Sequence, residues 1–212
     1  MAIADGIKVC IAVPSSDYVP SYFAMALAGL IQYQSPKTYV RLINQMGSLI
    51  ADNRLRLLSD ARQLGATHIL YIDADMTFPL NALELLLEHD LDIVCATAPR
   101  RTDNDGLMPI GTPLHQDEVT SSKRLVEMAE VGMCMMLIKM SVFEKLPQPC
   151  FAYPVINGQM LGEDFYFCHL ARQSGFRIWC DMGLSFAMGH VGTKIYKVES
   201  IEQREAKILR VA

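Results

Sequence analysis

Two carboxylates that follow a largely apolar segment are the strongest candidates for chemistry in this chain. The segment 68–72 (HILYI) is followed by Asp73 and Asp75 at positions i and i+2. In an extended chain, side chains two residues apart point to the same side, so both carboxylates can reach one ion. Carboxylate oxygens suit hard cations such as Mg²⁺ or Mn²⁺, which would let an acidic protein hold a diphosphate. The alternative is that Asp75 and Thr77 cap a helix that opens at Pro79.

A second candidate is a polar pair on the apolar side of a helix predicted over residues 48–64. When successive residues are placed at about 100° intervals, Asn53 and Arg54 fall within the apolar arc of this helix. A buried guanidinium needs an anion. Arg54 is therefore expected either to pair with Asp73 or another acid of the protein, or to contact an anionic ligand. The arc is defined by Leu49, Ile50, Leu57, Leu58, Ala61 and Leu64.

An acidic pair opens a further helix, predicted over residues 163–174. The helical spacing places Asp164 in the middle of the apolar face and Glu163 at its margin, with Gly162 before them. Capping of the helix N-terminus is one explanation of the pair. A carboxylate that faces inward from this position can also take a proton from an incoming hydroxyl.

His190 is the histidine with the most distinctive setting of the five. It lies between Gly189 and Gly192 and follows an apolar segment, 184–188, that is predicted to be a strand. The flanking glycines indicate tight backbone placement. Both a structural role and a role as a ligand remain open for it.

The elements that must position these residues alternate between strand and helix. Such alternation predicts an α/β sheet with helices on both faces and a ligand site at the carboxyl ends of the strands. The polar stretch 98–122 is expected to be a functional loop or disordered. Strands are predicted at 7–13, 38–43, 67–72, 91–97 and 176–180, and two further strands, expected to be adjacent, at 124–129 and 131–139. Helices are predicted at 20–33 and 79–89, with a short one at 141–145.

Composition sets the class of protein and excludes several partners. The 212 residues, with 51% hydrophobic and 20% charged, predict one core-rich domain. The net charge of −4 gives no general attraction to nucleic acid or to an anionic membrane. The longest apolar runs are too short to span a membrane, and no secretory signal is visible. Six scattered cysteines without a CxxC pair indicate core residues in a reducing compartment, so we expect a cytoplasmic protein.

Taken in order along the chain, these segments resemble the nucleotide-sugar-dependent glycosyltransferases of the GT-A fold, especially compact, family-two-like enzymes of bacteria and phages. The resemblance covers most of the chain. It implies a GT-A, Rossmann-like domain over residues 1–194, with a mostly parallel central sheet, and a surface helix or tail over residues 195–212. The matching pieces are Val9–Pro14 (VCIAVP), Asn53-Arg54, residues 71–79 (YIDADMTFP), Gly162-Glu163-Asp164 and His190.

The resemblance also implies a role for each candidate residue. Asp75 would coordinate Mn²⁺ or Mg²⁺, Asp73 would face the ribose or the metal, and His190 would supply another metal ligand. The acidic pair of Glu163 and Asp164 would hold the catalytic base. The nucleotide-sugar pocket would include Pro14, Ser15, Asn53, Arg54, Asp73 and Ala74; Arg100, beside Arg101, would clamp the diphosphate or the acceptor, or belong to a solvated loop.

The function implied is a metal-dependent glycosyltransferase of the hexosyltransferase class, using a nucleoside diphosphate sugar, above all a UDP-sugar. The acceptor hydroxyl would belong to a glycan, a lipid-linked molecule or a protein. We expect inversion, with Asp164 as the base, although a histidine ligand also occurs in retaining GT-A enzymes. One alternative is a sugar-1-phosphate nucleotidyltransferase, which normally has a glycine-rich basic loop where this chain has residues 14–17 (PSSD). Another is a noncatalytic carbohydrate-binding or phage structural protein.

Overall fold

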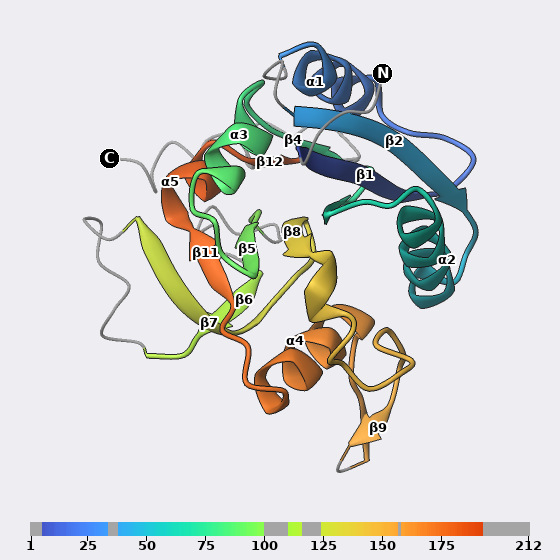
Figure 1. Ribbon diagram of the computed structural model, residues 1–212, viewed down its shortest axis with the longest axis vertical. Helices are drawn as coiled ribbons and strands as arrows, with labels where there is room; N and C mark the ends of the chain where they lie inside the picture. Colours follow the sequence, from blue (N-terminus) through green and yellow to red (C-terminus); the bar gives the residue numbers. More distant parts are fainter. Residues whose placement is uncertain (1–5, 34–37, 100–109, 116–123, 157, 193–212) are drawn as a thin grey trace, which may run out of the picture.

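The fold is built on one central sheet, seen edge-on between helices in Figure 1. The computed structural model describes residues 6–33, 38–99, 110–115, 124–156 and 158–192. Eight strands pair in the order β2-β1-β3-β8-β5-β11-β7-β6. Their bounds are β1 Ile7–Ser15, β2 Thr38–Met46, β3 His68–Ile72, β5 Ile93–Ala96, β6 Gly111–Pro113, β7 Leu125–Val131, β8 Met135–Lys139 and β11 Trp179–Asp181.

The sheet is mixed, and six of its eight strands run in one direction. Strand β1 pairs in parallel with β2 and β3, and β5 pairs in parallel with β11. Strands β8 and β7 run the opposite way, β8 between β3 and β5, and β7 between β11 and β6. The α/β fold predicted from the sequence is confirmed.

The prediction that segments 124–129 and 131–139 form adjacent strands is wrong, because β5 and β11 lie between β8 and β7. The burial of the two strands explains the separation. Strand β8 is buried over four of its five residues and suits the middle of the sheet, covered on both faces. Strand β7 alternates between buried and half-exposed residues, which suits a position near the edge.

Helices cover both faces of the sheet, as predicted. Side chains alternate along β1, so Cys10 and Ala12 pack in one core cluster with α2 and α4, whereas Val9 and Ile11 pack in the other with α1, α3 and α5. All six cysteines are buried and unpaired, which confirms their prediction as core residues. The helices are α1 Ser21–Gln32, α2 Ile50–Gln63, α3 Ala82–Leu87, α4 Glu163–Gln173 and α5 Met182–Phe186; a 3-10 turn, Met140–Val142, stands near the helix predicted at 141–145.

The strand predicted at 184–188 is wrong. This segment contains the end of α5, and the Asp181 side chain caps that helix by accepting from the Leu184 N–H at 2.9 Å. Leu184 and Met188 are buried at the i, i+4 spacing of a helix, while Phe186, which an alternating strand would bury beside them, is 78% exposed. The chain then forms β12, Gly189–His190, which pairs antiparallel with β4, Met76–Thr77.

Several predicted segments fall partly or wholly outside the described residues. Within the polar stretch 98–122, residues 111–113 form β6 at the edge of the sheet, and the segments 100–109 and 116–123 are not described. The tail predicted over residues 195–212, and the domain limit at residue 194, also lie outside the described part. Among the described helices, none has the length and apolar composition needed to cross a membrane.

Candidate functional site

A cavity of about 550 Å³ at the carboxyl ends of β1, β2 and β3 brings together most of the residues that the sequence analysis selected. Each segment reaches it from a different element, since Ser15 ends β1, Asp73 follows β3, and Glu163 begins α4. Asn53 is not among the lining residues, and Arg100 lies outside the described residues. The predicted residues that do line the cavity are Pro14, Ser15, Arg54, Asp73, Ala74, Asp75, Glu163, Asp164 and His190.

Asn53 does not line this cavity but supports Gly47, which does. It is buried, and its side-chain amide donates to the Gly47 carbonyl at 3.0 Å. A Cβ at Gly47 would lie 2.8 Å from the Asn53 side-chain oxygen, so the approach requires glycine. On the opposite side of the strand end, Asn44 donates to the Ser15 hydroxyl at 2.8 Å. Two amides therefore fix the ends of β1 and β2 around the pocket.

Arg54 links two carboxylates across the floor of the site. It is 2% exposed; Nη2 donates to Asp73 Oδ1 at 2.8 Å and Nη1 donates to Glu163 Oε1 at 2.7 Å. The expectation of an ion pair with Asp73 or another acid is confirmed, and the partners are two. Its Nε is buried without a hydrogen-bond partner among the described residues.

Burial sets the electrostatics of this triad. Burial opposes the charge of Arg54, but the carboxylates of Asp73 and Glu163 outweigh it and raise the pKa of the guanidinium. Burial also raises the pKa of Asp73, and the attraction of Arg54 offsets this only in part. Arg54 thus holds two acids in place at the edge of the cavity.

Asp75 and His190 meet at the junction of β4 and β12. The antiparallel pairing sets His190 opposite Met76, and the Val191 N–H donates to the Asp75 carbonyl at 2.8 Å. The ring Nε2 of His190 lies 3.3 Å from Asp75 Oδ2. The helix that follows, α3, begins at Ala82 with Asn81 as its N-cap. The alternative that Asp75 and Thr77 cap a helix opening at Pro79 is therefore wrong.

The second ring nitrogen of His190 determines what Nε2 can do. Nδ1 lies 2.9 Å from the Pro99 carbonyl, which can only accept, so Nδ1 carries the proton. In a neutral ring, Nε2 then presents a lone pair to the Asp75 carboxylate. Two acceptors facing one another need either a second proton on the ring or a cation between them. Metal-binding histidines typically donate their other N–H to a carbonyl in this way.

The chemistry of the pair fits a divalent cation. Ligands at about 2.1 Å from one ion and at right angles lie about 3 Å apart, close to the Nε2 to Oδ2 distance of 3.3 Å. Among the described residues, no group of three or more His, Cys, Asp or Glu side chains is arranged to hold a metal. Mg²⁺ sites commonly use one or two carboxylates and take their remaining ligands from substrate phosphates and water. The third predicted ligand, Asp73, is bound by Arg54.

Asp164 lies at the N-terminus of α4 and lines the same cavity. The order of burial differs from the prediction, since Glu163 is the buried member of the pair and Asp164 is half-buried. The reason is Arg54, which draws Glu163 inward. The N-cap residue is Gly162, which offers no side chain; Asp164 Oδ1 accepts from the Phe165 N–H at 2.8 Å.

The surroundings of Asp164 suit a proton acceptor. A Cβ at Gly162 would lie 2.8 Å from Oδ1, and one at Gly132 would lie 3.6 Å from Oδ2, so two glycines leave room around the carboxylate. Burial raises the pKa of Asp164, and the neighbouring charge of Glu163 raises it further. A raised pKa makes the carboxylate a better base than an exposed aspartate.

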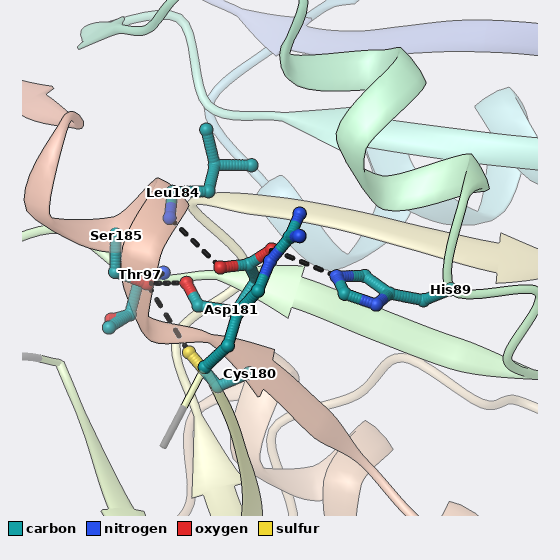
Figure 2. A network of polar contacts seen from close by, with 7 residues as sticks. His89, Thr97, Cys180, Asp181, Leu184 and Ser185 are labelled. Carbon is teal, nitrogen blue, oxygen red and sulfur yellow. Dashed lines mark hydrogen bonds and ion pairs between the residues drawn. The ribbon is translucent and has the colours of Figure 1, made fainter. Parts of the chain in front are cut away.

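A polar network that the sequence analysis missed supports the segment beside His190 (Figure 2). Asp181 is fully buried and accepts from Arg124 Nε at 3.1 Å, while His89 Nε2 lies 2.8 Å from the same oxygen. The Ser185 hydroxyl donates to the Asp181 carbonyl and accepts from the Thr97 N–H at 3.0 Å. Thr97 is two residues before Pro99, the partner of His190, so this network fixes the position of the histidine indirectly.

Comparisons with known proteins identify the fold. No protein-family model matches the chain, and no curated protein matches it in sequence. The structure is similar to that of A197 from STIV, with a TM-score of 0.59, 14% identity, and coverage of 92% of this chain and 100% of the other. It is also similar to GalNAc-T7 crystallised with UDP, GalNAc and Mn²⁺, with a TM-score of 0.54, 15% identity and 92% of this chain covered.

A further similarity is to S. aureus TarS, with a TM-score of 0.50, 13% identity and 88% of this chain covered. The chain spans 45% of the GalNAc-T7 chain and 37% of the TarS chain. These similarities show that the chain has a GT-A, Rossmann-like α/β fold in a single domain.

Proposed function

We propose that this protein is a metal-dependent glycosyltransferase that moves a sugar from a nucleoside diphosphate sugar, with UDP as the expected nucleotide, to an acceptor hydroxyl with inversion. The observation that carries the proposal is the convergence of His190 Nε2 on Asp75 in the same cavity as Asp164. The similarity in fold to GalNAc-T7, crystallised with UDP, GalNAc and Mn²⁺, supports the same class of ligands.

The donor would occupy the cavity at the strand ends. Asp75 and His190 would hold Mn²⁺ or Mg²⁺, which supplies positive charge where the departing diphosphate becomes more negative. Pro14 and Ser15 would contact the nucleoside, because they end β1 at the rim of the cavity. Asp73, oriented by Arg54, would accept a hydrogen bond from a ribose hydroxyl through its remaining lone pairs.

Asp164 is the proposed base. Its carboxylate would take the proton of the acceptor hydroxyl while that oxygen forms a bond to the anomeric carbon and the bond from this carbon to the diphosphate oxygen breaks. An in-line displacement of this kind inverts the anomeric centre. Glu163, which the sequence analysis grouped with Asp164, would act as a positioning residue because its carboxylate already accepts from Arg54 at 2.7 Å.

The nucleotidyltransferase alternative has less support from the structure. The segment that follows β1, residues 16–20, leads into α1 without a lysine or arginine, so it offers no basic loop for a triphosphate. A noncatalytic binding protein would not require a half-buried Asp164 with a raised pKa in the same cavity as the pair of Asp75 and His190.

Incubation with a panel of nucleotide sugars, Mn²⁺ and simple sugar acceptors tests the proposal. Release of nucleoside diphosphate that depends on Mn²⁺ and is lost in Asp75→Ala supports it. Release of pyrophosphate from a nucleoside triphosphate and a sugar 1-phosphate would instead establish the nucleotidyltransferase, and neither product would favour the binding protein. NMR of the product's anomeric configuration decides between inversion and retention.

A further inference from the structure

A second cavity, of about 340 Å³, adjoins the helix that carries the proposed base. Its lining includes Phe165, His169 and Arg172 of α4, and Ile156, Gln159 and Met160 of the hairpin formed by β9, Val155–Ile156, and β10, Gln159–Met160. The hairpin packs beside α4 at the lower end of the molecule in Figure 1. A cavity of this volume lies within the range of small-molecule sites, about 300–1,000 Å³.

The geometry of α4 places this cavity opposite the donor pocket. At about 100° per residue, Phe165, His169 and Arg172 fall within about 60° of one another, and the direction of Glu163 is about 150° away. By the same spacing, Asp164 points between the direction of Glu163 and that of Phe165, His169 and Arg172. Its Oδ1 accepts from the Phe165 N–H. The proposed base therefore lines the pocket with the donor residues, and the next residue of α4, Phe165, lines the second cavity. An acceptor must approach the base from the side away from the diphosphate.

The polar groups of the second cavity include both hydrogen-bond donors and acceptors. Arg172 can only donate, the Glu130 carboxylate can only accept, and Gln159 and His169 can do either. Glu130 Oε1 accepts from the Thr112 hydroxyl at 3.1 Å, which leaves its other oxygen for a ligand. Within the described ranges, no side-chain hydrogen bond or ion pair is formed by Arg172, His169 or Gln159.

The apolar groups of the cavity form the remainder of its lining. Phe165 is half-buried, and Met160 and Ile156 are 72% and 39% exposed. Residues 148–162, which contain the hairpin, include no charged side chain. Large exposed apolar side chains next to unpaired polar groups are typical of a ligand site rather than of a solvated surface.

A sugar matches this combination better than a phosphate or a hydrocarbon chain does. A phosphate offers acceptors alone and would be repelled by Glu130, whereas a hydrocarbon chain would leave Arg172 and Gln159 without partners. A sugar offers hydroxyls that both donate and accept, together with a C–H face that can cover Phe165. We propose that this cavity is the acceptor subsite and that the acceptor is a carbohydrate, which presents its hydroxyl to Asp164. This inference rests on the proposed function.

Methionine methyl groups provide a direct test. In protein labelled with ¹³C-methyl methionine, the Met160 signal, assigned with Met160→Leu, reports on the proposed subsite. Met182 and Met188 line a different cavity and serve as internal controls. Titration with a panel of free mono- and disaccharides should shift the Met160 signal saturably for at least one sugar, with a Kd in the range of about 1 mM, and leave both controls unchanged. Inorganic phosphate and n-hexanol should cause no such shift.

Variants test the polar contacts. Arg172→Met and Glu130→Gln should each weaken binding of that sugar by about 3- to 10-fold, as expected for the loss of one hydrogen bond. Arg56→Met, which changes an exposed arginine on the remote helix α2, should bind it like the parent protein. In transfer assays, Arg172→Met should raise the acceptor KM.

Three results would overturn the subsite. They are a Met160 signal that no sugar in the panel shifts, an affinity that neither variant changes, and binding of phosphate or n-hexanol in preference to sugars. The donor pocket is tested separately in the same samples with UDP and Mg²⁺. Sugar binding without UDP binding would refute the proposed function and keep the carbohydrate site, whereas UDP binding without sugar binding would refute the subsite alone.

Discussion

Replacing Arg54 with methionine measures what the ion pairs in the cavity at the strand ends contribute to stability, because methionine keeps much of the volume and removes the charge. Removal of one partner from a buried ion pair costs about 3–5 kcal/mol. Here the Glu163 carboxylate side chain is 12% exposed, but that of Asp73 is 32% exposed and can recover part of its hydration. We therefore expect Arg54→Met to lower the free energy of unfolding by about 3 kcal/mol at pH 7.

The same variant should show a specific dependence on pH. Burial already holds the pKa of Asp73 above its usual range, and the loss of Arg54 removes the charge that opposes this shift. For a group whose folded-state pKa exceeds the unfolded value, ionisation costs stability; the cost is absent below the unfolded pKa and grows as the pH rises through the folded pKa. The stability lost in Arg54→Met is therefore largest near pH 7 and smaller near about pH 4.

Urea unfolding followed by circular dichroism at both pH values gives the two free energies. Arg56→Met is the matched control on the same helix, because Arg56 is 65% exposed and its pair with Asp52 should contribute less than about 0.5 kcal/mol. Combining Arg54→Met with Asp73→Asn and Glu163→Gln should restore most of the stability. A loss below about 1 kcal/mol, or an equal loss at both pH values, would contradict the assignment of Arg54 as a buried link between two charged acids.

Three further predictions concern the chemistry of the site. Asp75→Ala should abolish Mn²⁺-dependent UDP binding measured by calorimetry and leave the fold intact, and His190→Ala should weaken this binding less. If Asp75→Ala binds UDP and Mn²⁺ like the parent protein, the metal assignment is wrong. Asp164→Asn should lower turnover by about 10²–10⁴-fold with donor affinity nearly unchanged, so near-normal turnover would exclude Asp164 as the base. Burial and then Glu163 raise the pKa of Asp164, so activity should fall as the pH drops through that raised pKa. Glu163→Gln should move this acidic limb of the pH–rate profile to lower pH. An acidic limb that does not move would show that another group sets it.

The parts of the structure that follow from local sequence patterns were predicted well. Helical spacing alone placed Asn53 and Arg54 on the buried side of α2, where they are 3% and 2% exposed. Strand burial likewise placed Asp73 and Asp75 just beyond the end of β3. These predictions needed only the spacing of apolar residues along the chain and the burial of one face of each element.

Choices between distant partners could not be made from the sequence. Nothing local selects Glu163 as the second partner of Arg54, because 109 residues separate them. The contact between His89 and Asp181 spans 92 residues, and it depends on β11 lying beside β5. The segment 184–188 fitted a strand and a helix equally in its apolar residues, and only the Asp181 cap and the exposure of Phe186 distinguish them.

Arg54 connects the two halves of the proposed reaction. Asp73 belongs to the chain segment that carries Asp75, the proposed metal ligand, whereas Glu163 belongs to the helix that carries Asp164, the proposed base. One buried side chain therefore links these two segments, with bonds of 2.8 Å and 2.7 Å. In the proposed reaction, this link would set the distance between the leaving group and the base. A displacement reaction is sensitive to shifts of about 1 Å in that distance. Both the stability provided by the ion pairs and the alignment needed for catalysis would then depend on Arg54. Arg54→Lys keeps the charge but not the forked geometry, so it should lower kcat more than it lowers stability.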